Sequence, residues 1–372
     1  MSIDISSVRR AVERQVPRRV PGISVVAGTS GGIAFEHAFG VSDLESGLPM
    51  DSATICNWFS MTKLVTATSV VQLAEEGLLD LDAPAVRHYE AIGQLSPSAS
   101  AQQITIRNLL SHSSGIGNPL PLRWVHRADE AGPTSSDFVQ RQLKRHRRLR
   151  FRPGDKAAYS NLGYLVLGEI VANVSGQSFE DRVRSRILNP LMMSRTGFSV
   201  TQGDDHWATP YHPLSGIGPR IARVLVPRSV VGSRQGRFLS LEHFYVDGPA
   251  YGGLVGPASE AMRFAMASLN DGELNGARVL LAESAREMRK IVIGSKNIEV
   301  GLGWFRRSKN VGDASFVEHL GGGAGFWNCL RVYPEDDCAV VVMGNSTSYD
   351  HEKVVGAAKK MVSSLERPRR LA

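Results

Sequence analysis

The two ends of the chain carry hydrophobic patterns typical of β-strands, and helical patterns lie between them. Residues 23–27 and 33–39 are apolar runs joined by a glycine-rich connector, so they predict a hairpin. Near the C-terminus, similar runs predict four more strands and a final helix. The strands are expected over 301–305, 316–320, 325–333 and 338–343, and the helix over 354–365.

Apolar positions at helical spacing dominate the middle of the chain, from about residue 78 to residue 290. Thr105 and Thr134 precede two such segments, at positions where a threonine can cap a helix. A further apolar helix is expected over 162–174. The segment 203–246 has little periodicity and predicts long loops over a surface or cleft.

Strands at both ends that enclose a helical middle predict an α/β fold of the α+β type. We expect one antiparallel sheet built from both termini, flanked by helices, with a helical subdomain inserted. Residues 1–77 and 291–372 would form the sheet domain, and residues 78–290 would form a helix-rich subdomain with long loops. The length of 372 residues suits this division into two parts.

The spacing with the most chemical content joins Ser60 and Lys63, at the start of an apolar segment that Gly77 ends. Residues three apart share a helix face, so the hydroxyl and the amine would lie about one turn apart. The segment 64–76 is apolar on almost every side, which predicts a buried helix with Ser60 at its N-terminus. There the helix dipole favours a serine alkoxide, and burial pushes Lys63 toward its neutral, basic form.

A second serine motif competes with this interpretation. The connector around Ser30, with the sequence Gly-Thr-Ser-Gly-Gly, matches the G-x-S-x-G pattern of the nucleophile elbow in α/β-hydrolases. An elbow requires a helix after the serine, whereas a predicted strand follows here. We therefore interpret Ser30 as part of a hairpin turn and Ser60 as the candidate nucleophile.

Two further segments could line a pocket. In an extended chain, residues two apart point the same way, so Tyr159 and Asn161 could form one wall. His319 and Gly321 have the same spacing on a predicted strand. Gly321 and Gly322 would let a substrate approach the backbone, whose N–H groups could stabilise an oxyanion. Taken singly, these residues also fit a turn, a core histidine and a bulge.

Composition narrows the expected partners. The formal net charge is +7, and much of it comes from a basic run between Arg141 and Arg152. Between Arg141 and Arg150 no phenylalanine, tyrosine or tryptophan interleaves with this run, so we interpret it as a solvated helix face and expect neither nucleic acid nor a membrane as partner. Asp204-Asp205-His206 and His212 have no recognised ligand spacing, so neither a metal nor a cofactor is expected.

The termini and the cysteines bear on location. The N-terminal residues show no export signal, and no apolar run approaches the roughly 20 residues that span a bilayer. The three cysteines fit no zinc or redox spacing. Cys338 would lie opposite Tyr333 in a hairpin, and not opposite Cys329, so no disulfide is implied. These features lead us to expect a cytoplasmic protein.

Taken together and in this order, the motifs S-x-x-K, Y-x-N and H-x-G resemble those of the penicillin-recognising serine hydrolases. That family includes class C β-lactamases, D-Ala-D-Ala carboxypeptidases and family VIII esterases. The resemblance covers roughly residues 20–350 and implies a β-lactamase/transpeptidase-like fold, with the active site between the sheet domain and the helical subdomain. The further segments that carry it are 109–115, 151–154, 159–164, 167–170, 190–192, 251–254, 301–304 and 325–326.

The resemblance also implies roles for single residues. Ser60 would be the acylated nucleophile, with Lys63 as its general base or proton relay. Tyr159 would act as base in acylation and as acid toward the leaving group. A phenol normally titrates near about 10, so the charge of Lys63 would have to keep it poised. Asn161 would bind the acyl group, and the N–H groups of Ser60 and Gly322 would form the oxyanion hole.

Two departures from the family pattern shape the expected function. His319 stands where β-lactamases of this kind carry lysine, and Leu320 stands where a hydroxyl residue usually binds the carboxylate of the antibiotic. An imidazole binds a carboxylate less well than a permanent cation does, so strong β-lactamase activity is not expected.

We expect a serine hydrolase that cleaves small-molecule carboxylic esters through an acyl-enzyme, with acyl transfer as a further outcome. The alternatives are a D-amino-acid amidase or DD-peptidase-like enzyme with weak β-lactamase activity, and a non-catalytic penicillin-binding-like sensor.

Overall fold

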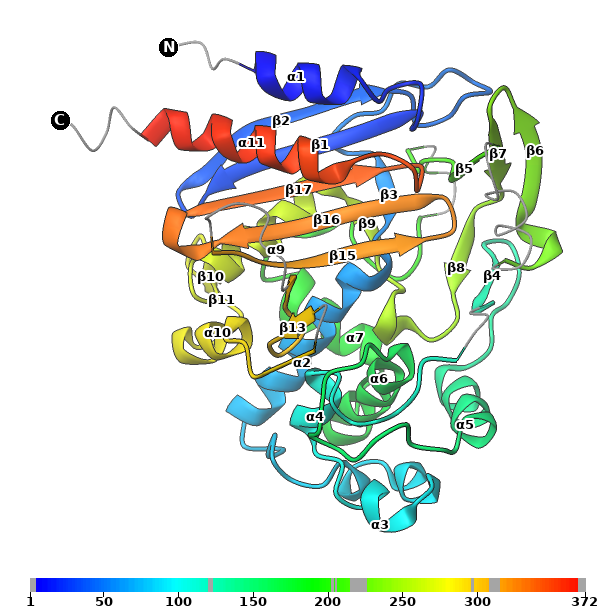
Figure 1. Ribbon diagram of the computed structural model, residues 1–372, viewed down its shortest axis with the longest axis vertical. Coiled ribbons are helices and arrows are strands. Elements are labelled where there is room, and N and C mark those ends of the chain that lie inside the picture. Colours follow the sequence, from blue (N-terminus) through cyan, green and yellow to red (C-terminus); the bar gives the residue numbers. More distant parts are fainter. Residues whose placement is uncertain are drawn as a thin grey trace.

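The computed structural model describes residues 5–119, 123–201, 204, 206–214, 226–295, 298–307 and 315–366. Its largest sheet has eight antiparallel strands in the spatial order β12-β13-β14-β15-β16-β17-β1-β2 (Figure 1). The bounds are Gly22–Thr29 (β1), Gly32–Gly40 (β2), Ile293–Gly294 (β12), Ile298–Val300 (β13), Phe305–Arg307 (β14), Val317–Gly323 (β15), Phe326–Tyr333 (β16) and Cys338–Gly344 (β17). The predicted α+β fold, with one sheet made from both ends of the chain, is confirmed.

The N-terminal hairpin has the form that the glycine-rich connector predicts. β1 pairs with β2, and Ser30 lies in the turn between them. The Ser30 backbone N–H and hydroxyl donate to the Asp337 carboxylate at 3.0 and 2.9 Å. Asp337 lies in the turn between β16 and β17, so this bond fastens two neighbouring hairpin turns together. Ser30 therefore has a structural partner and no helix behind it, as the hairpin interpretation requires.

The C-terminal hairpin also has the predicted register. Tyr333 lies opposite Cys338, and Cys329 lies opposite Val342. All three cysteines of the chain are buried and unbridged. Burial in an apolar core raises the pKa of the Cys56 thiol to about 12, so this side chain behaves as a small core hydrophobe.

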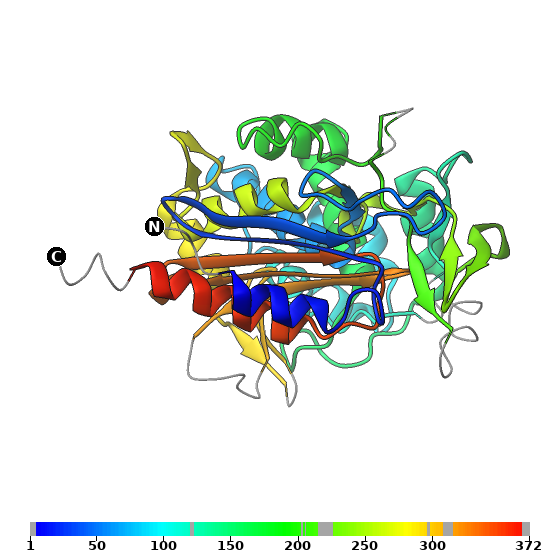
Figure 2. The same cartoon turned by 90° about the horizontal axis from the view of Figure 1, so that it is seen from above.

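Two helices cover one face of the large sheet. α1 (Ser6–Glu13) and α11 (His351–Glu366) pack against each other along β1 and β17 (Figures 1 and 2). Val8 and Val12 of α1 share a buried cluster with Val354 and Val355 of α11. The helix expected over 354–365 is confirmed, and it begins three residues earlier than the pattern indicates.

The opposite face is covered by α9 (Ala258–Leu269), which packs against β1, β16 and β17 (Figure 2). α2 (Thr62–Glu75) lies on the same side and packs against α6 (Asn161–Ser175). Every residue of α2 from Thr62 to Leu73 is buried, which matches an apolar pattern that shows no polar face. Gly77, with φ +70°, follows α2 and supplies the left-handed residue that ends the helix.

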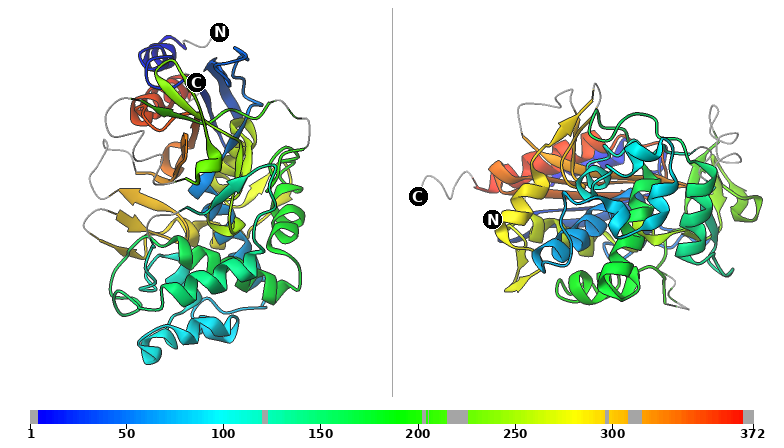
Figure 3. Two further views of the ribbon diagram at one scale, coloured as in Figure 1. Left: turned by 90° about the vertical axis from the view of Figure 1, so that its right-hand side faces the viewer. Right: turned by 90° about the horizontal axis from the view of Figure 1, so that it is seen from below.

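Of the remaining helices, α3, α4 and α5 lie in the lower part of the molecule, and α7 and α10 lie closer to its middle (Figures 1 and 3). Their bounds are Ser98–Ala101 (α3), Ile106–Leu110 (α4), Ser135–Arg145 (α5), Phe179–Val183 (α7) and Ala282–Arg289 (α10). Both predicted caps are present, because Thr105 accepts from the N–H of Asn108 and Thr134 accepts from the N–H of Asp137. These side chains satisfy backbone donors that the first helical turn leaves free.

The basic run only partly fits its interpretation as a helix face. α5 ends at Arg145, so Arg147, Arg148 and Arg150 lie beyond the helix in an extended segment. The backbone N–H of Leu149 donates to Ser96, which holds this segment against the neighbouring loop. The interpretation as a helix face therefore does not apply to the three arginines that follow the helix.

Two sequence expectations for strands and loops are wrong. Residues 301–304 form a turn between β13 and β14 instead of a strand, closed by the Gly301 N–H to the Trp304 carbonyl at 2.8 Å. Gly303 adopts φ +88° there, a conformation that favours glycine. Buried Trp304 made the segment resemble a strand.

The segment 203–246 is not only loop. β5 (Tyr211–Pro213), β6 (Val231–Gln235) and β7 (Phe238–Leu241) form a small sheet, while residues 202–203, 205 and 215–225 lie outside the described residues. Of three further strand pairs, the first two named below join distant segments, and the third is a local hairpin. They are Ile55–Asn57 (β3) with Val255–Pro257 (β9), Val125–Arg127 (β4) with Phe244–Val246 (β8), and Glu273–Leu274 (β10) with Ala277–Arg278 (β11).

Among the described residues, no helix is both long and apolar enough to cross a bilayer. The division into a sheet domain (1–77 and 291–372) and a helix-rich subdomain (78–290) stays a prediction.

Candidate active site

Ser60 lies in η1 (Phe59–Met61), one turn of 3₁₀ helix that leads into α2. Strand β3 precedes it, and its end is held by the Trp58 N–H, which donates to the Leu254 carbonyl at 2.8 Å. Phe59 adopts φ +48°, in the left-handed region that non-glycine residues avoid. This tight turn leaves Ser60 partly exposed, while Lys63 one turn later is fully buried.

Strand β15 approaches η1 closely because it carries glycines. A Cβ atom on Gly321 would overlap the carbonyl oxygen of Trp58, and one on Gly323 would overlap the ring of Phe59. Sequence reasoning assigned this close approach to a substrate, whereas at Gly321 the protein's own backbone occupies the space. A Cβ atom on Gly322 would point to the other side, toward the Trp327 ring. That the Gly322 N–H serves an oxyanion stays a prediction.

Lys63 has the environment of a neutral amine. Its Nζ atom lies 3.1 Å from Ser60 Oγ and 2.6 Å from the Tyr251 carbonyl oxygen. The side chain is 0% exposed, and burial lowers its pKa well below the ordinary value. Among the described residues, no carboxylate forms an ion pair with it. The rings of Tyr159, Tyr164 and Tyr251 lie 4.9 to 5.5 Å from Nζ and favour the protonated form, which tempers this shift.

The Tyr159 hydroxyl donates a hydrogen bond to Ser60 Oγ at 2.6 Å. Burial raises the pKa of this phenol, and the bond to Ser60 opposes that shift without reversing it. The phenol is therefore protonated at neutral pH, and the expectation that the charge of Lys63 lowers its pKa is not supported. Lys63 is the better proton acceptor of the two.

Asn161 begins α6, directly after the Ser160 cap, whose hydroxyl accepts from the Gly163 N–H at 3.0 Å. The Asn161 backbone N–H donates to Asn118 Oδ1 at 3.2 Å. Its side chain is 5% exposed, and among the described residues its Oδ1 atom has no hydrogen-bond partner. The backbone therefore fixes this residue two positions after Tyr159, and its side chain keeps a buried acceptor without a partner.

His319 lies beside Tyr159, with ring centroids 6.5 Å apart, and it is 1% exposed. Burial lowers the pKa of His319 to about 3, so the imidazole is neutral. Its Nδ1 atom lies 2.9 Å from the Leu320 carbonyl, which makes Nδ1 the protonated nitrogen and leaves Nε2 as a buried acceptor. A contact between His319 and substrate stays a prediction.

Sequence reasoning assigned no role to His112, although this residue supports the Tyr159 segment directly. Its ring lies 4.6 Å from that of Tyr159, and its Nδ1 atom accepts from the Ser160 N–H at 3.1 Å. His112 is 1% exposed, and its backbone adopts a left-handed conformation with φ +55°. Burial lowers the pKa of His112 far below its ordinary value, so this imidazole is neutral.

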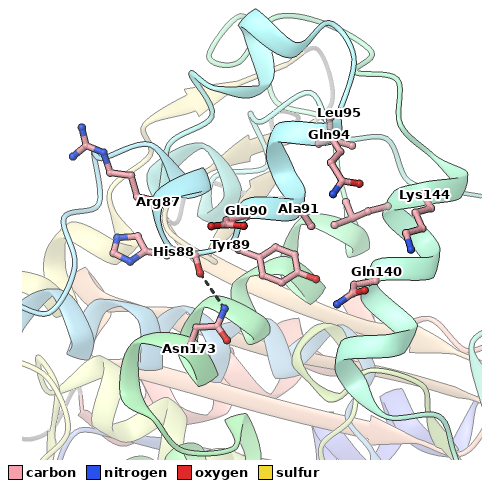
Figure 4. A pocket seen from close by; sticks show the side chains of 11 residues that line it. Arg87, His88, Tyr89, Glu90, Ala91, Gln94, Leu95, Gln140, Lys144 and Asn173 are labelled. Carbon is pink, nitrogen blue, oxygen red and sulfur yellow. Dashed lines mark hydrogen bonds between the residues drawn. The ribbon is translucent and has the colours of Figure 1, made fainter.

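The structure thus brings together Ser60, Lys63 and Tyr159 by direct contact, with the His319 ring beside that of Tyr159. A contact of the Asn161 side chain with this group stays a prediction. A separate cavity of about 540 Å³ lies among η3 (Glu90–Gln94), α5 and α6 (Figure 4). It is lined by Tyr89, Gln140 and Asn173 among others, and by none of the predicted site residues. Asp205, part of the segment judged unsuitable for metal binding, lies outside the described residues.

The sequence also resembles those of known proteins. The profile of the Beta-lactamase family matches residues 8–361. Esterase EstB of Burkholderia gladioli is 33% identical over 202 residues, a stretch that covers 52% of this chain and 51% of that protein. The chain thus spans about half the length of this curated relative.

Solved structures have the same fold. The octameric penicillin-binding protein homologue from Pyrococcus abyssi superposes with a TM-score of 0.77 at 24% identity, covering 98% of this chain and 77% of that one. D-amino acid amidase from Ochrobactrum anthropi SV3, in complex with D-phenylalanine, gives 0.78 at 22% identity, covering 98% and 99%. The predicted β-lactamase/transpeptidase-like fold is confirmed.

Proposed function

Because this chain belongs to the Beta-lactamase family, we propose that it is a serine hydrolase that cleaves carboxylic esters through a covalent acyl-enzyme on Ser60. One observation carries the proposal. Ser60 Oγ lies within hydrogen-bond distance of both the Lys63 amine, at 3.1 Å, and the Tyr159 hydroxyl, at 2.6 Å. A nucleophile in contact with a base and with a proton donor is the arrangement that acyl transfer requires.

Acylation begins when neutral Lys63 takes the proton of the Ser60 hydroxyl. Ser60 Oγ forms a bond to the ester carbonyl carbon, and the carbonyl electrons move onto its oxygen. When this oxyanion collapses, the bond to the alkoxy leaving group breaks. Tyr159 gives its proton to the departing oxygen and recovers one from protonated Lys63. The cycle leaves both groups as they began, with an acyl ester on Ser60 and a free alcohol.

Deacylation reverses these proton movements. Neutral Lys63 takes a proton from water as the water oxygen attacks the acyl carbon, and protonated Lys63 returns that proton to Ser60 Oγ as the bond between Oγ and the acyl carbon breaks and the acid leaves. An alcohol or amine in place of water would give acyl transfer. The Ser60 and Gly322 N–H groups are the proposed oxyanion donors, and each such donor typically contributes about 3–4 kcal/mol to the transition state. Asn161, with its free buried Oδ1, is the proposed contact for the acyl group.

The neutral state of His319 favours esters over β-lactam antibiotics. Binding the antibiotic carboxylate is best served by a permanent cation, and this buried imidazole has a pKa of about 3. The esterase name of the relative that is 33% identical supports the same substrate class. We therefore propose a small-molecule ester as the substrate, with Ser60, Lys63 and Tyr159 as the catalytic residues.

Hydrolysis of 4-nitrophenyl butyrate by the purified chain tests this proposal. We expect a burst of nitrophenolate, and labelling of Ser60 by a fluorophosphonate probe detected by intact mass. Ser60→Ala should abolish both, whereas Ser30→Ala, which changes a serine in the hairpin turn, should retain both. Full activity in Ser60→Ala would contradict the proposal. Absence of labelling in the native chain would favour a non-catalytic binding protein.

An amidase for D-amino-acid substrates is the second candidate. It is favoured by the superposition on D-amino acid amidase, which extends over 98% of this chain. D-phenylalanine amide and D-phenylalanine methyl ester separate the two candidates, because they differ only in the leaving group. A kcat/KM for the amide that equals or exceeds that for the ester would identify the amidase.

A further inference from the structure

A strongly basic groove lies beside the loop that supports Asn161. It has a volume of about 620 Å³, and six basic side chains line it together with residues 117–119. The six are Lys144, Arg145, His146, Arg147, Arg148 and Arg150. No lining residue carries a carboxylate. We call this feature the basic groove.

The charges in the basic groove lack internal compensation. Its lysine and four arginines supply most of the formal net charge of +7. Within the part of the chain that the structure describes, none of these five side chains forms an ion pair, although arginines elsewhere do so, such as Arg107 with Asp82 at 2.7 Å. Like charges held together repel one another, so an anion that enters the groove would be attracted by all of them.

The wall of the basic groove is tied to the active site. Asn118 lines the groove and accepts from the backbone N–H of Asn161 at 3.2 Å. The neighbouring Gly117 carbonyl lies 3.5 Å from the Ser160 hydroxyl. Gly117 also has no side chain, which lets Arg150 lie against it. The same short loop therefore contacts the start of α6 on one side and the aliphatic part of the Arg150 side chain on the other.

We propose that the basic groove binds a multiply charged anionic group of the substrate, of the phosphate or polycarboxylate type, at a distance from the bond that is cleaved. This inference rests on the proposed function, because it gives that function its substrate class. Arginine side chains suit such groups, since the planar guanidinium donates two parallel hydrogen bonds to phosphate or carboxylate oxygens.

The size and composition of the groove favour a small anion over a macromolecule. Its volume falls within the range of about 300–1,000 Å³ that is typical of small-molecule sites. Its side chains include no phenylalanine, tyrosine or tryptophan on which bases could stack. The cavity that shares Lys144 with the groove differs, because its lining includes the carboxylate of Glu90 and three neutral amide side chains beside its cations (Figure 4). That cavity carries no comparable preference for anions.

Equilibrium binding tests the groove without any catalysis. Calorimetric titration of the native chain with inorganic tripolyphosphate and, separately, with citrate should give one site, with an affinity that falls as salt rises. The stronger of the two arms identifies phosphate or carboxylate as the preferred chemistry. Arg147→Glu/Arg148→Glu should weaken binding at least tenfold. The matched control Arg9→Glu/Arg10→Glu makes the same charge change on exposed positions of α1 and should bind normally.

Two butyryl thioesters test the link to the substrate. Butyryl-pantetheine and butyryl-coenzyme A share the scissile bond and differ in the phosphate-bearing nucleotide. We expect at least a tenfold higher kcat/KM for the coenzyme A thioester, arising in KM, and loss of this preference in Arg147→Glu/Arg148→Glu. Thermal melting of both double variants should match the native chain, because all four side chains are exposed.

The outcomes are distinguishable from a failure of the proposed function. Equal kcat/KM for the two thioesters, with Ser60-dependent hydrolysis of both, would overturn this inference and leave the hydrolase intact. Tighter binding to a duplex oligonucleotide than to tripolyphosphate would also overturn it, and would identify the groove as a nucleic-acid surface. If the native chain hydrolysed neither thioester nor 4-nitrophenyl butyrate, this result would instead contradict the proposed function.

Discussion

The Nζ atom of Lys63 lies 3.1 Å from Ser60 Oγ, in a position where the lysine is completely buried. A buried amine without a carboxylate partner opposes folding whenever it is charged. Lys63→Met should therefore abolish ester hydrolysis and raise the free energy of unfolding by about 1 kcal/mol or more. Urea unfolding at pH 7 and an assay with 4-nitrophenyl butyrate check both parts. An active or a destabilised variant would contradict this account.

The pH dependence should follow the same amine. Burial lowers the pKa of Lys63 in the folded state, and the base must be neutral, so kcat/KM should rise with pH to a plateau and be lost as pH falls through that pKa. Between that pKa and about 10.4 the unfolded chain binds the extra proton, so stability should also rise with pH. Lys63→Met should flatten the stability curve over this window. An unchanged slope would assign the effect to other groups.

Tyr159→Phe tests the phenol as a proton donor. The change removes the 2.6 Å hydrogen bond to Ser60 and keeps the ring that contacts His112 and His319. Because general acid catalysis typically contributes about 10²–10⁴-fold, kcat should fall within that range while the melting temperature changes little. The loss should be smaller for esters with good leaving groups, which need less protonation. Equal losses for nitrophenyl and alkyl esters would argue against this role.

His112 should act as a positioning residue for the Tyr159 segment. His112→Phe keeps an aromatic ring but leaves the buried Ser160 N–H without its acceptor, at a cost of about 1–3 kcal/mol in stability. We expect kcat to fall with little change in KM. His112→Asn should recover part of both losses, because an amide oxygen can replace Nδ1 and asparagine tolerates the φ of +55°. If His112→Asn had a kcat and a stability no higher than those of His112→Phe, this explanation would be excluded.

Gly321→Ala tests the close approach of β15 to η1. The added Cβ would meet the Trp58 carbonyl oxygen, so the turn that presents Ser60 must shift. Both stability and kcat should fall. Gly356→Ala is the matched control, since a Cβ there meets nothing within 4 Å and alanine suits the interior of α11. It should retain activity and gain up to about 1 kcal/mol. Normal activity in Gly321→Ala would show that the backbone yields easily.

Local sequence rules predicted the parts of the site that depend on helix geometry. The spacing of Ser60 and Lys63 placed a hydroxyl beside an amine, and the caps at Thr105 and Thr134 marked real helix starts. The Tyr251 contact to Lys63 could not be predicted in this way, because a backbone carbonyl is common to every residue type. The same limit applies to the position of Gly321, whose neighbour Trp58 is distant in sequence.

Errors arose where tertiary pairing decides the local structure. Residues 301–304 look like a strand because they are apolar, but the chain must turn there to bring β14 alongside β13. The strands between 211 and 241 are short and pair with one another, so the alternation along each strand is too brief to detect. His112 has an ordinary sequence context, and its contact with Tyr159 depends on how α4 meets α6.

The left-handed backbone of Phe59 has a consequence for engineering. Such a conformation costs a non-glycine residue roughly 1–2 kcal/mol, and here it aims the adjacent hydroxyl. Selection for heat resistance alone would favour any substitution that relaxes the backbone at Phe59, and the Ser60 hydroxyl would then lose its orientation. A directed-evolution campaign on this chain should therefore screen turnover in every round, and it will find its harmless gains on α11 and the outer hairpins.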